Sequence, residues 1–280
     1  MSLLSGKTMV GGVVGHPVAH SLSPRIHSQW LADAGIDGAY VPFPVAEDGF
    51  ERFVDAMRGG VIRGVNVTIP FKEVARRVAD RMDDQSQQAG ASNLLLFHAD
   101  GTVEARNTDG FGLTEALRQD AGYDFAAGPV VVLGAGGAAR GAAAALIAAG
   151  VPEMRLVNRT GSKAADLAKA FPRTYPFAWA DMARALEGAS AVVNATAGGL
   201  NGEGDLDLPL DSLPGAAVVM DMVYKPLETG LLKAAKARGL GTVDGLSMLI
   251  NQAVPSFEAL FGQAPPKTTD ARAVALAMLK

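Results

Sequence analysis

The chain has 280 residues, which suits one large domain or two of ordinary size, and two is the better expectation. Hydrophobic residues make up 49% of it and charged residues 19%, so it has ample material for buried cores and is not globally disordered. The formal net charge of −4 argues against a general binder of nucleic acid or anionic membranes, and the lack of cysteine excludes disulfides, Cys-ligated zinc and thiol nucleophiles.

No targeting or membrane signal is visible in the sequence. The start, MSLLSGKTMVGG, lacks the charged region and long apolar run of a secretory leader. The longest apolar run of the central region, AAAALIAA at 142–149, is far shorter than the roughly 18 residues that a membrane span requires. We therefore expect a soluble, cytoplasmic protein without a membrane partner.

Strands and helices alternate in the first part of the chain, as in α/β folds with mostly parallel sheets. Ser23-Pro24 is a good N-cap and N1 pair for a helix that runs to about Ala34 and stops at Gly35. The other expected elements are strands at 9–14, 39–43 and 63–73, helices at 47–58 and 73–82, and a hairpin of 94–97 with 102–105.

The stretch RGVNVTIPFKE at 63–73 has the period-two pattern of a strand. Val65, Val67 and Ile69 are predicted to pack on one face, while Asn66 and Thr68 share the other. Lys72 follows Pro70 directly. One interpretation is an edge strand that runs into a solvated loop, and the other is a strand that presents donors to a ligand.

A second series of units runs from about Asn107 to Asp244 and predicts a doubly wound module. The tail after it holds two helical stretches, separated by Pro265-Pro266. The expected strands of the module are 130–133, 154–157, 174–177, 190–194, 217–221 and 242–243, and its helices are 137–149, 162–170, 181–187 and 228–238.

The segment VVVLGAGGAARG at 130–141 carries a dinucleotide-binding pattern. Gly134, Gly136 and Ala139 occupy the G-x-G-x-x-G/A positions after a strand and at the start of a helix, whose free N–H groups can bind a pyrophosphate. The alternative is a glycine-rich turn that only packs helix against strand, which needs just one or two of the glycines.

The end of the next strand indicates which dinucleotide is bound. An NAD site usually has a carboxylate here, which accepts from the ribose 2′-OH. This chain has Asn158 instead, followed by Arg159, Thr160 and Lys163, which suit a 2′-phosphate through charge-assisted hydrogen bonds. We therefore expect NADP, with a basic solvated turn as the alternative.

Polar residues outside this module suggest a second site. Clefts between domains are typical places for such sites. A lysine and an aspartate can form a proton-handling pair. Ser23 could equally be only a helix cap. The residues are Ser21, Ser23, Asn66, Thr68, Lys72, Asn93, Asn107, Thr108 and Asp109.

The histidines do not indicate a metal site. His16 and His20 are separated by Pro17 and lack neighbouring acidic or thiol ligands. His27 and His98 are expected to be ordinary core or surface histidines. No metal is expected.

Nine short motifs in order resemble the shikimate dehydrogenase family from end to end. They are GHPVAHSLSP, NVTIPFK, AGASN, NTDG, GAGGAARG, NRT, NATAGG, DMVYKP and GLSMLINQ. The resemblance implies a two-domain α/β enzyme that interconverts 3-dehydroshikimate and shikimate with NADP in aromatic amino-acid biosynthesis. It also implies a discontinuous substrate domain, 1–108 with 245–280, around a Rossmann-type NADP-binding domain, 109–244.

The resemblance assigns roles to individual residues. Lys72 would be the acid/base at the reacting oxygen, with Asp109 as its partner. Ser21 and Ser23 would hold the substrate carboxylate with help from Tyr224. Binding of the ring hydroxyls would involve Thr68, Lys72, Asn93, Asp109 and Gln252, with Asn66 on the same strand face. Cofactor contacts would come from Gly134, Ala135, Gly136, Gly137, Ala138, Asn158, Arg159, Thr160, Lys163, Met222, Gly245 and Asp84.

Two alternatives remain open. Ser28, Leu94 and Ala197 depart from the usual family pattern and leave room for relaxed specificity between shikimate and quinate. A non-catalytic dinucleotide sensor would be expected to lose Lys72 and Asp109, yet both are present. The sequence does not distinguish a monomer from a homodimer.

Overall fold

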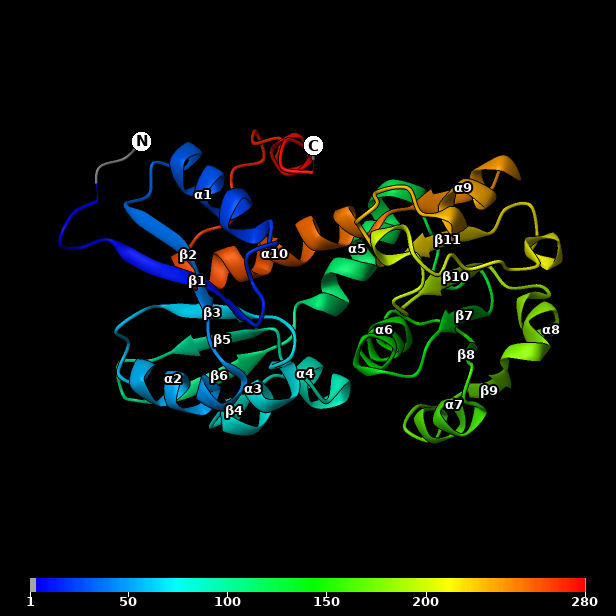
Figure 1. The fold of residues 1–280 in the computed structure, drawn as a ribbon, viewed down its shortest axis with the longest axis horizontal. Helices are drawn as coiled ribbons and strands as arrows, with labels where there is room; N and C mark the ends of the chain where they lie inside the picture. The colour runs from blue at the N-terminus through cyan, green and yellow to red at the C-terminus, as the bar shows by residue number, and fades with distance from the viewer. Residues whose placement is uncertain (1–3, 280) are drawn as a thin grey trace. The chain divides into compact units, whose positions relative to one another are not determined.

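The computed structural model describes residues 4–279, which form two compact units (Figure 1). The first unit contains the chain up to Thr108 and resumes at Gln252, and the second is Asp109–Asn251. Helix α10 (Gly245–Phe261) has residues in both units. The domain boundary expected from the sequence, at residue 245, would instead place the whole helix in the first unit. Residues 1–3, the start of the MSLLSGKTMVGG segment, lie outside the described residues.

The described part of the first unit contains a six-stranded mixed sheet in the order β2-β1-β3-β5-β6-β4. The expected hairpin is confirmed, because β5 pairs antiparallel with β6 and also with β3, while the other neighbours are parallel. The strands are β1 (Met9–Gly15), β2 (Gly38–Pro44), β3 (Gly64–Val67), β4 (Arg81–Met82), β5 (Leu94–Phe97) and β6 (Val103–Arg106).

Helices pack on this sheet through large apolar side chains. Phe50 of α2 and Phe71, directly before α3, stack with ring centroids 4.5 Å apart, in one core with Val65 and Val67 of β3. A separate aromatic contact joins Trp30 of α1 to Phe257 of α10. The remaining helices of the unit are α1 (Ser23–Asp33), α2 (Phe50–Met57), α3 (Lys72–Val78), α4 (Asp84–Ala89) and α11 (Ala271–Leu276).

The predicted packing of Ile69 is wrong. Val65 and Val67 are buried as expected, but the side chain of Ile69 is 73% exposed. The reason is that β3 ends at Val67 and the chain then turns, with the Phe71 N–H donating to the Thr68 carbonyl over 3.0 Å. The turn breaks the period-two alternation, so that Phe71 enters the core instead of Ile69.

Two helix boundaries and one additional helix also differ from the predictions. Leu22 occupies the N-cap of α1, so Ser23 lies within the helix and makes no capping bond there. The helix expected at 73–82 ends at Val78, because Arg81 and Met82 pair with β6. Helix α4, which the sequence analysis did not predict, begins after Asp83, whose carboxylate accepts from the Ser86 N–H over 2.7 Å.

The second unit contains a six-stranded sheet, parallel throughout the described chain, in the order β12-β11-β10-β7-β8-β9. This is the doubly wound order of dinucleotide-binding folds, and it confirms the predicted fold class. The strands are β7 (Val130–Leu133), β8 (Met154–Asn158), β9 (Thr174–Ala178), β10 (Ala191–Asn194), β11 (Val218–Asp221) and β12 (Gly241–Val243).

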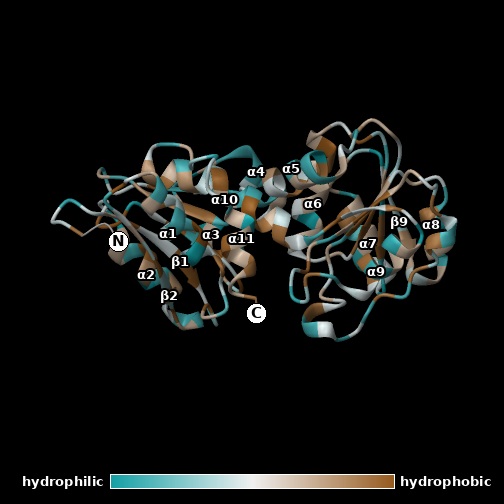
Figure 2. Cartoon of the chain, turned by 90° about the horizontal axis from the view of Figure 1, so that it is seen from above, coloured by the Kyte–Doolittle hydropathy of each residue, from teal (hydrophilic) through white to brown (hydrophobic). Residues whose placement is uncertain are grey.

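Both faces of this sheet are covered, which explains why its strands are apolar without alternation (Figure 2). Val130 and Val132 pack with α5, α6 and α7, while Val131 and Leu133 pack with α8 and α9. Helix α5 was not predicted, since Gly110 and Gly112 weaken its helical pattern. The helices are α5 (Asp109–Ala121), α6 (Gly137–Ala148), α7 (Gly161–Ala168), α8 (Met182–Leu186) and α9 (Gly230–Ala237).

Across residues 4–279, no helix has the length and apolar character needed to cross a membrane.

Because Phe71 is buried in the core and Ile69 is exposed, we expect substitutions at the two positions to affect stability differently. Phe71→Ala should lower the free energy of unfolding by about 3–5 kcal/mol, because it empties a buried aromatic site. Ile69→Ser should change it by less than about 0.5 kcal/mol, because the side chain is exposed. Urea unfolding of the two variants measures both values, and a comparable loss for Ile69→Ser would contradict this assignment.

Candidate functional site

The glycine-rich turn after β7 leaves open space above the start of α6. The backbone of Gly134 has φ +112°, and a Cβ there would lie 3.0 Å from the Ala195 carbonyl oxygen. Gly136 and Gly137 are exposed, and a Cβ on either would meet no described heavy atom within 4 Å. Since the first N–H groups of a helix lack partners within the helix, this space suits a pyrophosphate. Ala135 lies in the turn, and Ala138 lies in the first turn of α6.

The turn lies at the switch point of the doubly wound sheet. β7 pairs on one side with β10 and on the other with β8, and the chain leaves the carboxyl ends of β7 and β10 beside one another. The backbones of Gly134, directly after β7, and of Ala195, directly after β10, approach each other closely here. In open α/β sheets the crevice at the switch point is where dinucleotides bind.

The predicted 2′-phosphate residues run from the last residue of β8 into the first turn of α7. Arg159, Thr160 and Lys163 are exposed, and Asn158 orients the turn by donating from Nδ2 to the Thr160 carbonyl over 2.9 Å. Thr160 stands at the N-cap of α7 without a side-chain capping bond, so its hydroxyl is not used there. Within the described chain, neither Arg159 nor Lys163 forms an ion pair. These side chains are therefore available to a phosphate. The assignment of Arg159, Thr160 and Lys163 to the 2′-phosphate of NADP stays a prediction.

A buried carboxylate organises the loops that follow β10 and β11. Asp221 accepts from Asn194 Nδ2 over 2.9 Å, from the Val223 N–H over 3.0 Å and from Thr229 Oγ1 over 2.7 Å. Burial raises the pKa of Asp221 above its usual range, although these hydrogen bonds oppose the shift. Asn194 in turn accepts from the N–H and the hydroxyl of Thr196. Asp221 therefore ties the 194–199 loop to the loop that follows β11.

The family resemblance gave ligand roles to Met222, Tyr224 and Gly245. Met222 and Tyr224 follow β11, and Gly245 packs against the backbone of Met222. The Met222 N–H donates to the Asn194 carbonyl over 3.1 Å. A Cβ on Gly245 would lie 2.3 Å from the Met222 carbonyl oxygen, so glycine is needed there for close backbone packing. Burial raises the pKa of Tyr224. These contacts explain the residue types, and the ligand roles stay predictions.

We predict that Asp221 supports the fold through its acceptor oxygens. Asp221→Ala leaves three buried donors unpaired and should lower the free energy of unfolding by about 3 kcal/mol or more. Asp221→Asn should cost less, because its amide oxygen can keep two of these bonds and the Thr229 hydroxyl can reverse. Urea unfolding distinguishes the variants, and equal losses would show that pairing of the donors is not the cause.

In the first unit, the predicted substrate-binding amides belong to one buried hydrogen-bond network. Asn93 Nδ2 donates to Thr108 Oγ1 over 2.9 Å and to Gln252 Oε1 over 3.3 Å, and Asn93 Oδ1 accepts from the Thr108 N–H over 2.8 Å. Ser256 Oγ lies 3.2 Å from Thr108 Oγ1. Residues from three distant segments thus meet. The sequence placed Thr108 in the second site without a specific role, and it did not point to Ser256.

Asn66 has a different place from the one expected on an open strand face. Its side chain is buried, donates from Nδ2 to the Asn93 carbonyl over 3.2 Å and to Ser256 Oγ over 2.9 Å, and accepts from the Tyr40 hydroxyl over 2.8 Å. These three bonds use both amide hydrogens and one oxygen lone pair. Asn66 therefore supports the network, and its direct contact with a ligand stays a prediction.

The other predicted residues of the first unit lie at turns and helix starts. Lys72 is the first residue of α3, and its carbonyl accepts from the Ser92 N–H over 2.9 Å. Ser21 Oγ accepts from the Ser23 N–H over 3.3 Å. Thr68 is half-buried directly after β3, and Asp84 is exposed in the first turn of α4. Asp109, in the second unit, begins α5, so its pairing with Lys72 stays a prediction.

His27 is a core residue, which is one of the two ordinary environments expected for it. Its ring stacks on Tyr40 with centroids 4.0 Å apart, and neither ring nitrogen has a hydrogen-bond partner among the described residues. Burial lowers the pKa of His27 from 6.5 to about 3. His98, by contrast, is half-buried, with Nε2 3.0 Å from Glu104 Oε2. Residues 4–279 bring together no group of three His, Cys, Asp or Glu side chains suited to a metal.

The lowered pKa predicts a pH dependence. Between pH 6.5 and about 3, the unfolded state binds a proton at His27 that the folded state does not. Stability therefore falls as the pH falls through this window, by about 1.4 kcal/mol per pH unit from this residue. His27→Phe should remove the contribution, so its stability relative to the unsubstituted protein should rise by about 2 kcal/mol between pH 7 and pH 5. Urea unfolding of both proteins at several pH values measures this difference. The same pH dependence of the free energy of unfolding in both would refute the prediction.

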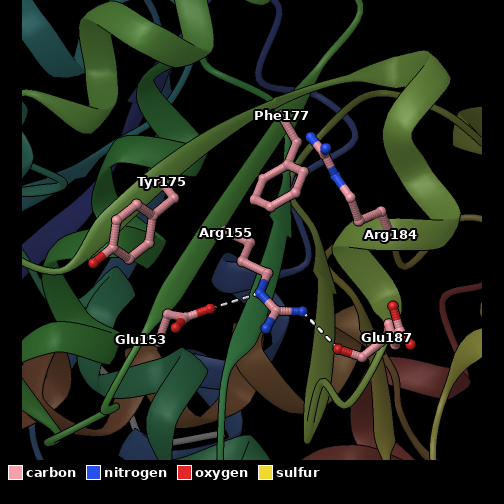
Figure 3. Close-up of a pocket in the computed structure, with 6 residues that line it drawn as sticks. All are labelled: Glu153, Arg155, Tyr175, Phe177, Arg184 and Glu187. Atoms are coloured by element: carbon pink, nitrogen blue, oxygen red, sulfur yellow. Dashed lines mark hydrogen bonds and ion pairs between the residues drawn. The ribbon is translucent and has the colours of Figure 1, made fainter.

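A separate hollow of about 420 Å³ lies on the second unit near β9 (Figure 3). Arg155 and Tyr175, which line it, are near the amino ends of β8 and β9, opposite the carboxyl edge where open α/β sheets typically bind dinucleotides. Arg155 is occupied by Glu153 at 2.7 Å and by the carbonyls of Ala185 and Glu187. In this hollow Arg155 therefore has a structural role, because it joins β8 to the end of α8.

Comparisons with known proteins agree with this geometry. The model of the shikimate dehydrogenase substrate binding domain matches residues 13–95, and that of shikimate/quinate 5-dehydrogenase matches residues 116–200. The chain is 53% identical over 278 residues to the shikimate dehydrogenase (NADP(+)) of Caulobacter vibrioides, and the match covers 99% of this chain and 98% of that one.

Two solved structures are similar over nearly their whole length. Shikimate 5-dehydrogenase from Thermus thermophilus, in complex with NADP(H) and shikimate, has a TM-score of 0.85 at 35% identity, and the match covers 97% of this chain and 98% of that one. Shikimate 5-dehydrogenase from Listeria monocytogenes, in complex with shikimate and NAD, has a TM-score of 0.89 at 28% identity, and the match covers 99% of each.

Proposed function

The chain belongs to the shikimate dehydrogenase family, and we propose that it catalyses the reversible NADPH-dependent reduction of 3-dehydroshikimate to shikimate. This reaction belongs to the shikimate pathway, which leads to chorismate and the aromatic amino acids. The observation that carries the proposal is the buried meeting of Asn93, Thr108 and Gln252, because it brings polar groups from three segments to one place in the unit that matches a substrate-binding domain.

A substrate rich in hydroxyl groups suits such a network. Asn93 and Gln252 carry amides that can donate and accept, and a site of this kind discriminates strongly against analogues that leave its polar groups unpaired. Thr68 is half-buried at the end of β3 and adds a hydroxyl. Ser21 and Ser23 would hold the carboxylate, and we propose that Tyr224 assists them.

Lys72 would handle the proton. When bound, NADPH would supply the hydride that reduces the carbonyl carbon of 3-dehydroshikimate. The carbonyl oxygen gains a proton from Lys72 as the C–O bond becomes single, and the reverse reaction returns that proton to the lysine. Asp109 would orient and balance the lysine charge.

The second unit would bind NADP. The space above Gly136 and Gly137 would accept the pyrophosphate, and Arg159, Thr160 and Lys163 would accept the 2′-phosphate. No Asp or Glu follows β8 directly in the sequence, so the usual acceptor for an unmodified ribose is missing from that position. NADP is therefore proposed as the preferred cofactor.

Other features remain predictions. These are a cytoplasmic location, the choice between monomer and homodimer, and strict preference for shikimate over quinate. The non-catalytic sensor predicts NADPH binding without turnover of either alcohol, and an activity assay separates the two hypotheses.

We predict that the purified protein oxidises shikimate with NADP much faster than with NAD, as followed by absorbance of the reduced nicotinamide. Lys72→Ala should lower kcat by about 10²–10⁴-fold, because general acid–base groups typically contribute that much. Lys163→Ala serves as the contrasting lysine variant, since loss of a phosphate contact should raise the KM for NADP more than it lowers kcat.

Each outcome of this assay has a distinct meaning. Turnover of quinate but not shikimate would keep the mechanism and change the substrate. NADPH binding with no turnover of either would refute the enzymatic function. An unchanged kcat in Lys72→Ala would remove the lysine from the proton transfer.

A further inference from the structure

Tyr40 carries a buried hydroxyl that none of the assignments above uses. The residue is 4% exposed, and its hydroxyl donates to Asn66 Oδ1 over 2.8 Å. Burial raises the pKa of this hydroxyl well above its ordinary value, and the side chain of Ser23 is close enough to oppose that shift. The Tyr40 ring is stacked on His27 at an interplanar angle of 12°, so packing fixes the direction in which the hydroxyl points.

On one side, the hydroxyl is connected to the amides of the site. Asn66, which accepts from Tyr40, donates to Ser256 Oγ over 2.9 Å. Ser256 Oγ lies 3.2 Å from Thr108 Oγ1, which contacts Gln252 Oε1 over 3.2 Å and Asn93 Nδ2 over 2.9 Å. Each of these groups is buried, so each depends on its neighbour for a partner.

On the other side, the hydroxyl faces Ser23, which is proposed to hold the substrate carboxylate. Tyr40 thus lies between the group that would bind the carboxylate and the groups that would bind the ring hydroxyls. All of these residues belong to the first unit. A phenylalanine would fill the same space but would leave Asn66 Oδ1 without this donor.

We propose that Tyr40 is a positioning residue whose hydroxyl sets the distance between the carboxylate-binding and hydroxyl-binding parts of the substrate site. The inference rests on the proposed function. Its action is indirect, through Ser23 and Asn66, and it does not involve the cofactor-binding unit. Substrate affinity should therefore depend on it more than the chemical step or NADPH binding does.

The test compares two Tyr→Phe variants that each remove one buried hydroxyl. In Tyr40→Phe, the KM for shikimate should rise about ten-fold or more, with a smaller change in kcat and an unchanged dissociation constant for NADPH by fluorescence titration. Tyr123→Phe is the matched control, because the Tyr123 hydroxyl lies 2.7 Å from Ser190 Oγ in the second unit. It should lower the thermal midpoint without changing the KM for shikimate.

The outcomes that overturn the proposal are specific. An unchanged KM in Tyr40→Phe, an equal rise in Tyr123→Phe, or a parallel loss of NADPH affinity in Tyr40→Phe would each refute a positioning role. If Tyr40→Phe does not fold, Ser256→Ala breaks the same network and should raise the KM in the same way, and an unchanged KM there is equally contrary. Failure of the unsubstituted protein to oxidise shikimate would refute the proposed function itself, before any variant is compared.

Discussion

The arrangement of the substrate-binding unit depends on the hydrogen bonds of one buried amide, the side chain of Asn66. A buried amide without partners is strongly unfavourable, so the elements that supply them are held in register with β3. Tyr40 comes from β2 and Ser256 from α10, while the Asn93 carbonyl directly precedes β5. The same bonds hold Gln252, one turn before Ser256, beside Asn93. The scaffold and the proposed ligand groups are therefore parts of one network.

The dinucleotide unit solves a similar problem with a carboxylate. Asp221 gathers donors from β10, from the loop that follows β11 and from the N-cap of α9. Burial raises the pKa of Asp221, and the hydrogen bonds from Thr229, Val223 and Asn194 oppose that shift. The loops at the switch point are thus held by internal polar contacts, which leaves the exposed glycine turn to a ligand.

Whether a polar side chain is already hydrogen-bonded within the protein distinguishes structural residues from candidate ligand-binding residues. Arg155 lines a hollow, but its guanidinium is already bonded to Glu153 and to two carbonyls at the end of α8. Arg159 is exposed beside an unused threonine hydroxyl at a helix start. Because a paired group has little to offer a ligand, Arg159 is the arginine that we assign to a phosphate.

Local pattern alone determined the α/β class, most strands, the glycine turn and the basic turn after β8, because period, capping and backbone geometry depend on neighbouring residues. The ordered motifs also indicated the family. Only tertiary structure decided that Phe71 rather than Ile69 enters the core, that β4 ends the third helix early, and that Asn66 is used internally. It also brought Tyr40, Thr108 and Ser256 into one network. Hydrogen bonds between residues up to about 190 positions apart leave no periodic signal in the sequence, since they depend on how the sheets and helices pack.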